Sequence, residues 1–476
     1  MWRHFFLFAV LSTLVSDICG QQVLVSDPYS IRNDFGYELI GRLRDRILVF
    51  RDRNDHFSVQ AYDEQMRLSW MRDLDDLEKK GIQILSVTCG RDDFSVIYKL
   101  KRRGRYYLRV HKYDPGAQLI DTLTVKAYGE QSFSPISLDV LRSEDHNCIA
   151  VYNTGERGFI EAVCLRLDKM QVLWDQAISI PVDQPDSGLR AMTLANNGDW
   201  FVIAEWYNRR NRIDEHELRI TQASGGKQFQ HRIPLREYLT HDLDAIPDNE
   251  NGQIVIGGLY SDKGRERAHG TFVVRADARA GQTLVSAYMP FELRLLSAIR
   301  KRDYDDETSK GLDDAKVARL LLRQDGGLVI IAERSHEILR GTMAGRGMFR
   351  EGMRAIIDFY YDDIIAIALH PDGTTHWSTV LHKKQYSQDD EGVFSSFFLM
   401  LAPERVSFLF NDEIKYESTS SAYGLYANGY YERNSLINTV NTNLRLRYRD
   451  ALQIGPRECL IPSELRNKMR LVLLKM

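Results

Sequence analysis

ANNGDWFVIAE, residues 195–205, is the stretch that decides the fold: a polar Asn-Gly turn leads straight into an apolar strand. The same sequence of turn and strand recurs as ILVFRD from Ile47, FSVIYK from Phe94, CIAVYN from Cys148, IVIGGL from Ile254, LVIIAE from Leu328 and VSFLFN from Val406. Neighbouring copies start 47 to 54 residues apart up to Ile254, and then 74 and 78 residues apart. Recurrence at this pitch is typical of repeat arrays such as propeller blades.

The repeating unit is predicted to be four antiparallel strands, of which the second is the most apolar. A polar turn precedes this strand, and Asn-Gly or Gly-Gly supplies the positive dihedrals of a tight hairpin. Two more strands follow it, as in YYLRVHKYD at 106–114 and QVLWDQAI at 171–178. Burial of the inner strands between neighbours, with an alternating outer strand, favours an all-β β-propeller.

Seven blades are expected over residues 21–476, which form a single domain. The predicted blades lie near 37–73, 82–126, 135–180, 188–234, 240–290, 315–383 and 394–453. The remaining segment, 456–476, is expected to close the ring. Trp70, Trp174 and Trp377 each stand early in a fourth strand, where we expect them to wedge between adjacent blades; a ligand stack is the alternative.

Composition indicates a globular protein without a nucleic-acid partner. Hydrophobic residues make up 43% and aromatic residues 10% of the chain, enough for a packed core. The 63 basic and 66 acidic residues leave a net charge of -3, so no long-range field favours a polyanion.

Residues 1–20 are predicted to be a secretory signal peptide. Arg3 and His4 precede an apolar run from Phe5 to Val15, which is too short to cross a bilayer. Cleavage is expected after Gly20, and lipidation at Cys19 remains an alternative. No later segment has the length of a transmembrane helix, so the mature protein is expected to be exported and either soluble or held by partners.

The cysteines of the mature chain are too few to form a disulfide framework. Cys148 and Cys164 flank a turn around Glu156, and a hairpin centred there would place them opposite each other. Export into an oxidising compartment allows a disulfide between them. The alternative is two small buried side chains on one face of a blade.

Three inserted loops are predicted in the C-terminal blades. They are Arg300 to Asp314, the run HEILRGTMAGRGMFREGM at 336–353, and Lys415 to Ser435; a short helix is expected at 291–300. The Tyr, Ser, Gly and Asn mixture of the third loop is similar in composition to an antibody paratope. Its candidate contacts with a protein or a glycan are Tyr423, Tyr426, Tyr430 and Tyr431.

The sequence carries no signature of catalysis, metal or cofactor binding. HExxH, GxSxG and the phosphate loop GxxxxGK[ST] do not occur. Two acidic groups, Asp303, Asp305, Asp306 and Glu307, and Asp389, Asp390 and Glu391, miss the EF-hand spacing and are interpreted as solvated loops.

A set of short motifs stands out in residues 359–400 and 408–414. They are a tyrosine-rich strand ending in an aspartate pair, an Asp-Gly turn leading to Trp, a Lys-Gln pair, a serine pair and an Asn-Asp strand end. The residues concerned are Tyr360, Tyr361, Asp362, Asp363, Asp372, Gly373, Trp377, Lys384, Gln385, Ser395, Ser396, Asn411 and Asp412. In these motifs the chain resembles a family of exported, uncharacterised proteins from Bacteroidetes. The resemblance implies an envelope location, in the periplasm or at the outer-membrane surface, and no particular activity.

Lys384, Gln385, Asn411 and Asp412 form a second candidate contact site, because all four are expected where strands meet loops. The alternative is that they tie blade ends together by hydrogen bonds to buried backbone groups. The sequence therefore favours a non-catalytic binding or scaffold protein, such as an accessory subunit of an outer-membrane transport or export complex. An enzyme that uses the propeller mouth, either glycan-active or quinoprotein-like, is the alternative.

Overall fold

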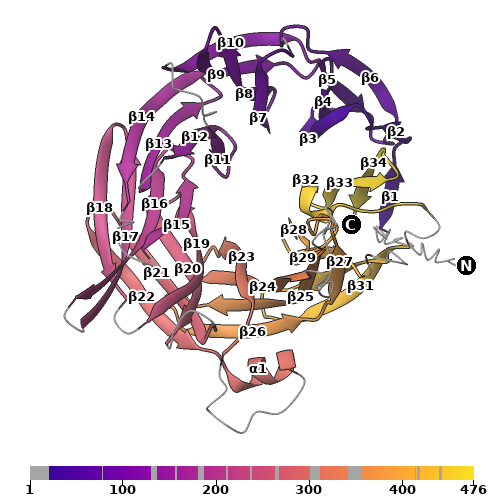
Figure 1. Ribbon diagram of the computed structural model, residues 1–476. Helices are drawn as coiled ribbons and strands as arrows, with labels where there is room; N and C mark the ends of the chain where they lie inside the picture. Colours follow the sequence, from indigo (N-terminus) through magenta and orange to yellow (C-terminus); the bar gives the residue numbers. More distant parts are fainter. Residues whose placement is uncertain are drawn as a thin grey trace, which may run out of the picture.

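The computed structural model describes residues 21–77, 79–129, 137–155, 158–180, 187–210, 213–235, 238–262, 267–300, 311–340, 356–412, 414, 419–438 and 442–476. Its strands form eight antiparallel sheets arranged in a ring, as Figure 1 shows. The chain is therefore an all-β β-propeller with eight blades.

Each blade has four strands in chain order from the centre outwards, except that the fourth strand of blade 8 comes from the N-terminus. Blades 1 to 4 are β3 (Asp34–Leu43), β4 (Arg46–Arg53), β5 (Phe57–Tyr62) and β6 (Leu68–Asp73); β7 (Ile82–Cys89), β8 (Phe94–Arg102), β9 (Arg105–Tyr113) and β10 (Leu119–Tyr128); β11 (Asp139–Arg142), β12 (Cys148–Thr154), β13 (Phe159–Arg166) and β14 (Gln171–Ser179); and β15 (Gly188–Leu194), β16 (Trp200–Arg210), β17 (Ile213–Ser224) and β18 (Lys227–Pro234). Blades 5 to 8 are β19 (Leu239–Asp248), β20 (Gln253–Ser261), β21 (Gly270–Asp277) and β22 (Gln282–Pro290); β23 (Ala315–Leu322), β24 (Leu328–Arg340), β25 (Ile356–Leu369) and β26 (Thr375–Leu381); β28 (Phe398–Leu401), β29 (Val406–Asn411), β30 (Thr419–Leu425) and β31 (Tyr431–Asn438); and β32 (Leu452–Gly455), β33 (Glu458–Leu465), β34 (Lys468–Lys475) and β1 (Gln22–Val25). Short β2 (Tyr29–Ser30) also pairs with β34, and β27 (Gln385–Gln388) pairs with β25.

The prediction of seven blades is wrong by one. Residues 452–475 supply three strands of an eighth blade, and the N-terminal strand β1 completes it by pairing antiparallel with β34, Gln22 opposite Lys475. The apolar run of β33 starts at Cys459, 53 residues after Val406 and thus on the regular pitch. The apolar pattern in the sequence does not reveal this repeat, because Pro462 interrupts the apolar run and because the outer strand of the blade lies at the other end of the chain.

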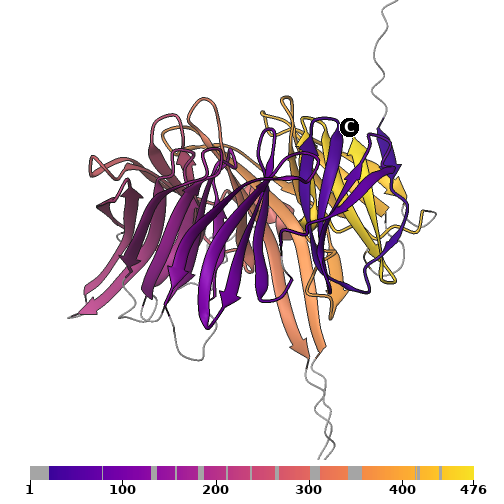
Figure 2. The same cartoon turned by 90° about the horizontal axis from the view of Figure 1, so that it is seen from above.

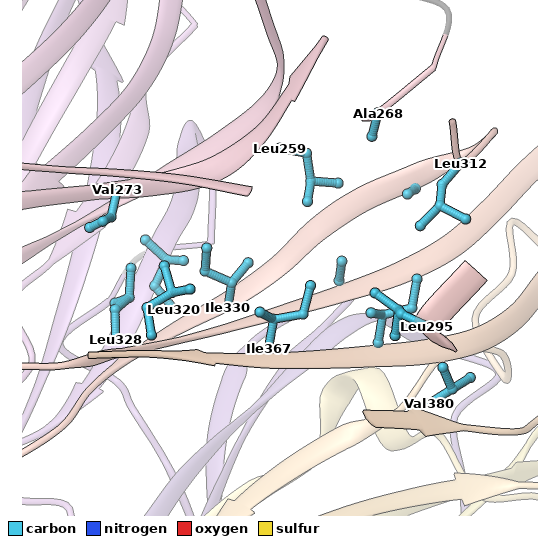
Figure 3. Packing of buried hydrophobic residues seen from close by; sticks show 14 of the residues in the cluster. Leu259, Ala268, Val273, Leu295, Leu312, Leu320, Leu328, Ile330, Ile367 and Val380 are labelled. Atoms are coloured by element: carbon cyan, nitrogen blue, oxygen red, sulfur yellow. The ribbon is translucent and has the colours of Figure 1, made fainter. Parts of the chain in front are cut away.

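Eight clusters of buried apolar side chains hold the ring together, one between each pair of neighbouring blades. Figure 3 shows the cluster between blades 5 and 6, where Val273 of β21 lies near Leu328 of blade 6. Strand β1 serves two such clusters, because Val23 packs between blades 7 and 8 and Leu24 between blades 8 and 1. Every interface is thus closed by packing, including the one that joins the two ends of the chain.

The ring has two distinct faces. The turns between first and second strands and between third and fourth strands lie on one, here called the turn face; the links from second to third strands and from blade to blade lie on the other, the connection face. Strands β24 and β25 extend past the disc on the connection face, pairing as far as Arg340 and Ile356, and β27 adds a third strand to this arm. Figure 2 shows the arm pointing down, with the C-terminus on the upper, turn face.

The predicted insertions are partly strand. The expected helix is present as α1 (Leu293–Arg300), whose Leu295, Leu296 and Ile299 enter the cluster between blades 5 and 6. Residues 336–340 belong to β24, and 301–310, 341–355 and 415–418 lie outside the described residues. The prediction of a loop from Lys415 to Ser435 is wrong, because residues 419–435 lie mainly in the hairpin β30–β31; the Tyr-Gly-Asn composition marks a blade hairpin here. No described helix has the length and hydropathy needed to span a membrane.

Candidate functional site

The four residues expected to converge at the end of blades 6 and 7 separate into a buried pair and two outer residues. Gln385 Nε2 donates to the backbone oxygen of Asn411 at 2.6 Å, and both side chains are buried. Asn411 Nδ2 donates to the carbonyls of Phe394 and Leu446, at 2.9 and 2.8 Å. These contacts favour a structural role for Gln385 and Asn411, in which their side-chain amides hold the ends of neighbouring blades together.

Lys384 and Asp412 take no part in these hydrogen bonds. Lys384 is exposed, and Asp412 lies 2.5 Å from Arg433 and accepts a hydrogen bond from Thr419.

The buried cation beside this pair is Lys383, whereas the sequence predicts a contact at its exposed neighbour Lys384. Lys383 Nζ lies 2.6 Å from Glu333 Oε1 and 3.1 Å from Gln385 Oε1. Burial lowers the pKa of Lys383, while the negative charge of Glu333 opposes that shift. The hydroxyl of Ser396 donates to the other Glu333 oxygen at 2.7 Å, so the carboxylate is held from two sides.

A repeated position explains why this cluster exists. Glu333 is the sixth residue of its apolar run, LVIIAE, and the sixth residues of the other runs include Asp52, Glu205 and Asn411. Each stands where the second strand of its blade leaves the disc on the connection face. Asp52 pairs with Lys79, and Glu205 pairs with Arg190 and accepts a hydrogen bond from Thr240. Polar residues at this position therefore fasten second strands either to the links between blades, as at Asp52 and Glu333, or to inner strands, as at Glu205. Alignment of the repeats shows this recurring polar position.

The four candidate tyrosines do not form one surface. Tyr423 is 4% exposed, packs in the cluster between blades 6 and 7, and donates to the carbonyl of His382 at 2.7 Å. Tyr430 and Tyr431 are 62% and 37% exposed, and the Tyr426 hydroxyl donates to Glu432. The prediction that Tyr423 contacts a partner conflicts with its burial, whereas the turn around Tyr430 remains open to solvent.

The tryptophans wedge between blades as predicted. Trp174 stacks on Trp200 of blade 4 at 5.7 Å between ring centroids and donates to the carbonyl of Gly198 at 2.8 Å. Trp377 donates to the carbonyl of Ala427 in blade 7, also at 2.8 Å. Trp70 packs against the cluster between blades 1 and 2.

Cys148 and Cys164 are free, buried thiols on the same hairpin. The hairpin register pairs Cys164 with Ala150 and Cys148 with Arg166, so the expected direct opposition of the two cysteines is wrong. Contact with Cys164 and with Arg166 lowers the pKa of Cys148 to about 7.

In the acidic group at 389–391, two carboxylates accept hydrogen bonds from backbone N–H groups. Asp389 accepts a hydrogen bond from the backbone N–H of Ile357, and Asp390 accepts one from Gly392. Residues 303–307 lie outside the described residues. Among the residues that the structure describes, no three His, Cys, Asp or Glu side chains are grouped as metal ligands.

A cavity of about 710 Å³ opens on the turn face; blades 5, 6 and 7 supply most of its lining, and Glu144 of blade 3 and Asn196 of blade 4 complete it. This volume lies in the range of ligand-binding pockets, about 300–1,000 Å³. Its apolar walls include Ile246, Leu321, Val329, Trp377, Leu401 and Leu425. Leu401, at the end of the short inner strand β28, is 47% exposed.

Several charged residues at the rim of this cavity are paired. Arg275 Nη1 lies 2.8 Å from Asp248, and Arg405 Nη1 lies 2.8 Å from Glu432. Glu404 pairs with Arg457 of blade 8, with 2.8 Å between Arg457 Nη2 and either carboxylate oxygen. Glu144 and Glu250 also line the cavity, and Glu144 accepts a hydrogen bond from the side-chain amide of Asn249 at 3.0 Å. The opening therefore combines apolar walls with a polar rim.

Fold and site together define an eight-bladed propeller with an apolar opening on its turn face. No protein family matches the chain, and no curated protein matches it. Among solved structures it is similar to BamB from Moraxella catarrhalis, with 10% identity, a TM-score of 0.36, and coverage of 96% of this chain and 100% of that one. It is also similar to an uncharacterized protein from Listeria monocytogenes, with 8% identity, a TM-score of 0.39 and coverage of 76% and 84%. A third similar structure is the β-propeller domain of the Trilobed protease from Pyrococcus furiosus. It has 11% identity and a TM-score of 0.36, and the match covers 87% of this chain and 98% of that one. Likeness at this level says nothing about what the chain binds.

Proposed function

We propose that this chain is a non-catalytic binding or scaffold protein of the bacterial cell envelope, and that the cavity on its turn face holds an apolar segment of a partner protein. The observation that carries this proposal is the opening of about 710 Å³ with apolar walls, at whose rim Arg275 and Arg405 are paired with Asp248 and Glu432. A group that packs on these walls buries apolar surface while those two ion pairs stay intact, and burial of apolar surface favours association.

Leu401 is the residue on which this binding depends most. It combines a wall position in the cavity with 47% exposure, so its side chain is available before a partner arrives. Removing such an apolar anchor from the centre of an interface typically costs 2 kcal/mol or more, roughly a thirtyfold loss of affinity.

The envelope location follows from the leader pattern of residues 1–20 and from the resemblance of residues 359–414 to exported proteins. Strand β1 begins at Gln22, directly after the expected cleavage site. A mature chain that starts at Gln21 would therefore retain the whole propeller, including its closing strand. The mass of the purified mature protein tests this, and a retained Met1 contradicts export by cleavage.

The binding proposal is tested by replacing one exposed leucine on each face. A photo-reactive side chain at Asn428, beside the cavity, should cross-link a protein from native membranes in the wild-type chain. Leu401→Asp should abolish this cross-link, whereas Leu339→Asp, at a residue 68% exposed on the arm of the opposite face, should leave it intact. Equal cross-linking in both variants, at unchanged melting temperature, refutes the cavity as the binding site.

A further inference from the structure

Cys148 and Cys164 lie on one face of the hairpin β12–β13, at its end nearest the turn face. The register places Cys148 opposite Arg166 and Cys164 opposite Ala150, so the two cysteines are diagonal neighbours. Both are buried in the cluster between blades 3 and 4. A Cβ built on Gly198 would lie 3.8 Å from Cys148 Sγ and 3.7 Å from Cys164 Sγ. The two sulfurs therefore converge on one point at the blade interface.

The diagonal arrangement suits a bridging metal ion better than a disulfide. Diagonal neighbours in an antiparallel pair have Cβ atoms somewhat less than about 7–8 Å apart, whereas a disulfide needs about 3.5–4.5 Å. An ion held between two thiolates adds two metal–sulfur bonds, each about 2.3 Å in the case of zinc, and so spans the wider gap. The hairpin thus holds the sulfurs at a separation that an ion can bridge.

The number of ligands decides which ion fits. Zinc in proteins is almost always bound by four ligands in a tetrahedron. Among the residues that the structure describes, no third His, Asp or Glu side chain joins the two cysteines in a ligand group. Cu(I) is a soft ion that thiolates select, and it is stable when two sulfurs alone bind it in a line. Two buried thiols without a third ligand therefore favour Cu(I).

Arg166 is placed to balance the charge of such a complex, since Cu(I) with two thiolates carries one net negative charge. Arg166 Nη2 lies 3.9 Å from Cys148 Sγ and donates to the Asn196 carbonyl at 3.3 Å. Its Nε is buried and has no hydrogen-bond acceptor among the described residues. Asp145 and Asp168 lie near the guanidinium but outside ion-pair distance. A buried donor without an acceptor favours an anionic group at the sulfurs.

Surface turns separate the cysteine pair from solvent. Cys148 is the first residue after the turn at 143–147, in which residues 144–146 are exposed. The turn of blade 4 at 195–198 forms the other cover, and the Asn196 carbonyl in it accepts a hydrogen bond from Cys148 Sγ at 3.3 Å. An ion can therefore reach the sulfurs when one of these turns moves, while the blades stay packed.

We propose that Cys148 and Cys164 bind one Cu(I) ion between blades 3 and 4, with Arg166 as the compensating charge. The ion replaces the two thiol protons, which pass to solvent, and no atom changes its oxidation state. The proposal does not rest on the function assigned to the turn-face cavity, since none of these three residues lines that cavity.

Anaerobic titration of the reduced mature protein with Cu(I), in competition with the chromogenic chelator bicinchoninate, tests the proposal. The chain should withdraw one Cu(I) ion from the chelator, and the bound ion should raise the melting temperature. Zn(II) should give no comparable rise, because two sulfurs leave its tetrahedron incomplete. No withdrawal of Cu(I), or an equal rise with Zn(II), overturns the proposal. Cysteines that resist alkylation in the unfolded, unreduced protein would reveal a disulfide instead and would also overturn it.

Single variants separate this pair from the other cysteines and test the role of Arg166. Cys148→Ser and Cys164→Ser should each abolish the withdrawal of Cu(I), whereas Cys89→Ser, beside the cluster between blades 1 and 2, should leave it unchanged. Arg166→Gln keeps both thiols and should weaken binding about tenfold, as expected for loss of a hydrogen bond from a charged group. Lys169→Gln, at an exposed lysine of the next turn, should not weaken it. Cu(I) retained in either serine variant overturns the site, and unaltered affinity of Arg166→Gln, at the melting temperature of the wild type, overturns the role of its charge.

Discussion

The side-chain amide of Gln453 takes the place of a neighbouring strand for Leu401. Gln453 Oε1 accepts the backbone N–H of Leu401 at 2.9 Å, and Nε2 donates to the Leu401 carbonyl at 2.6 Å. The inner edge of blade 7, which carries the most exposed leucine of the turn-face cavity, is thereby fixed by blade 8. The cavity and the closure of the ring are physically connected through this contact.

Gln453→Ala should lower the free energy of unfolding by about 1 kcal/mol, because water replaces two partly exposed hydrogen bonds. Gln453→Glu should also be destabilised, since the carboxylate can still accept the Leu401 N–H but places a second oxygen against the Leu401 carbonyl. Urea denaturation followed by fluorescence gives both values. A Gln453→Ala protein as stable as the wild type would show that the amide does not hold the edge.

The buried ion pair of blade 6 predicts very different effects for two adjacent lysines. Lys383→Met should cost about 3–5 kcal/mol, because it leaves Glu333 buried without its cation. Lys384→Met, at the exposed neighbour, should stay within about 0.5 kcal/mol of the wild type. The double variant Lys383→Met with Glu333→Gln should regain part of the loss. Equal stability of the two single lysine variants would contradict the assigned roles.

The repeat of strands can be predicted from the sequence, whereas the closure of the ring by strand β1 cannot. Turn chemistry and apolar second strands are local, so the first seven blades and helix α1 could be read from spacing alone. Strand β1 is four residues of QVLV with no partner nearby in the chain, and its pairing with β34 across 450 residues leaves no local trace.

The candidate sites were harder to predict for a similar reason. Lys383 and Lys384 are chemically equivalent in the sequence, and only the path of the link between β26 and β27 decides which of them is buried. Tyr423 and Tyr430 share one tyrosine-rich stretch, yet one lies in a strand and the other in a turn. The turn-face cavity forms where several blades meet, so no single segment of the chain predicts it.

Gly429 marks a close approach between blades that can be tested with a matched glycine. It has φ +84°, and a Cβ there would lie 2.9 Å from Trp377 Cδ2; Gly252 has φ +67° and no atom within 4 Å of such a Cβ. Both alanine substitutions carry the cost of the left-handed backbone, about 1–2 kcal/mol. Gly429→Ala should lose about 1–3 kcal/mol more, because Trp377 must move. Thermal denaturation that ranks the two variants equally would refute the contact.

Ring closure by strand β1 predicts a contrast between adjacent apolar residues. Leu24 packs between blades 8 and 1, whereas Val25 is 36% exposed. Leu24→Ala should destabilise the mature protein by about 2 kcal/mol, while Val25→Ala should stay within about 0.5 kcal/mol of the wild type. Hydrogen exchange should localise the effect, since amides of β34 paired with β1 would lose protection first. Unchanged protection in β34 would show that β1 does not close the ring.

His111 should make the free energy of unfolding decrease as the pH falls through the mildly acidic range. Its ring lies 2.7 Å from the Tyr98 hydroxyl and 3.2 Å from that of Tyr113, in the interface between blades 1 and 2. Burial, with a smaller contribution from Arg109, lowers the pKa of His111 from 6.5 to about 4. Between these values the unfolded chain binds a proton that the folded chain does not, so the free energy of unfolding should fall as the pH drops from about 6.5 to 4. His111→Gln retains a hydrogen-bonding side chain that does not titrate, and its stability should vary less over this range. NMR titration of the His111 ring measures the pKa directly, and a value near 6.5 in the folded protein would remove the basis for this dependence.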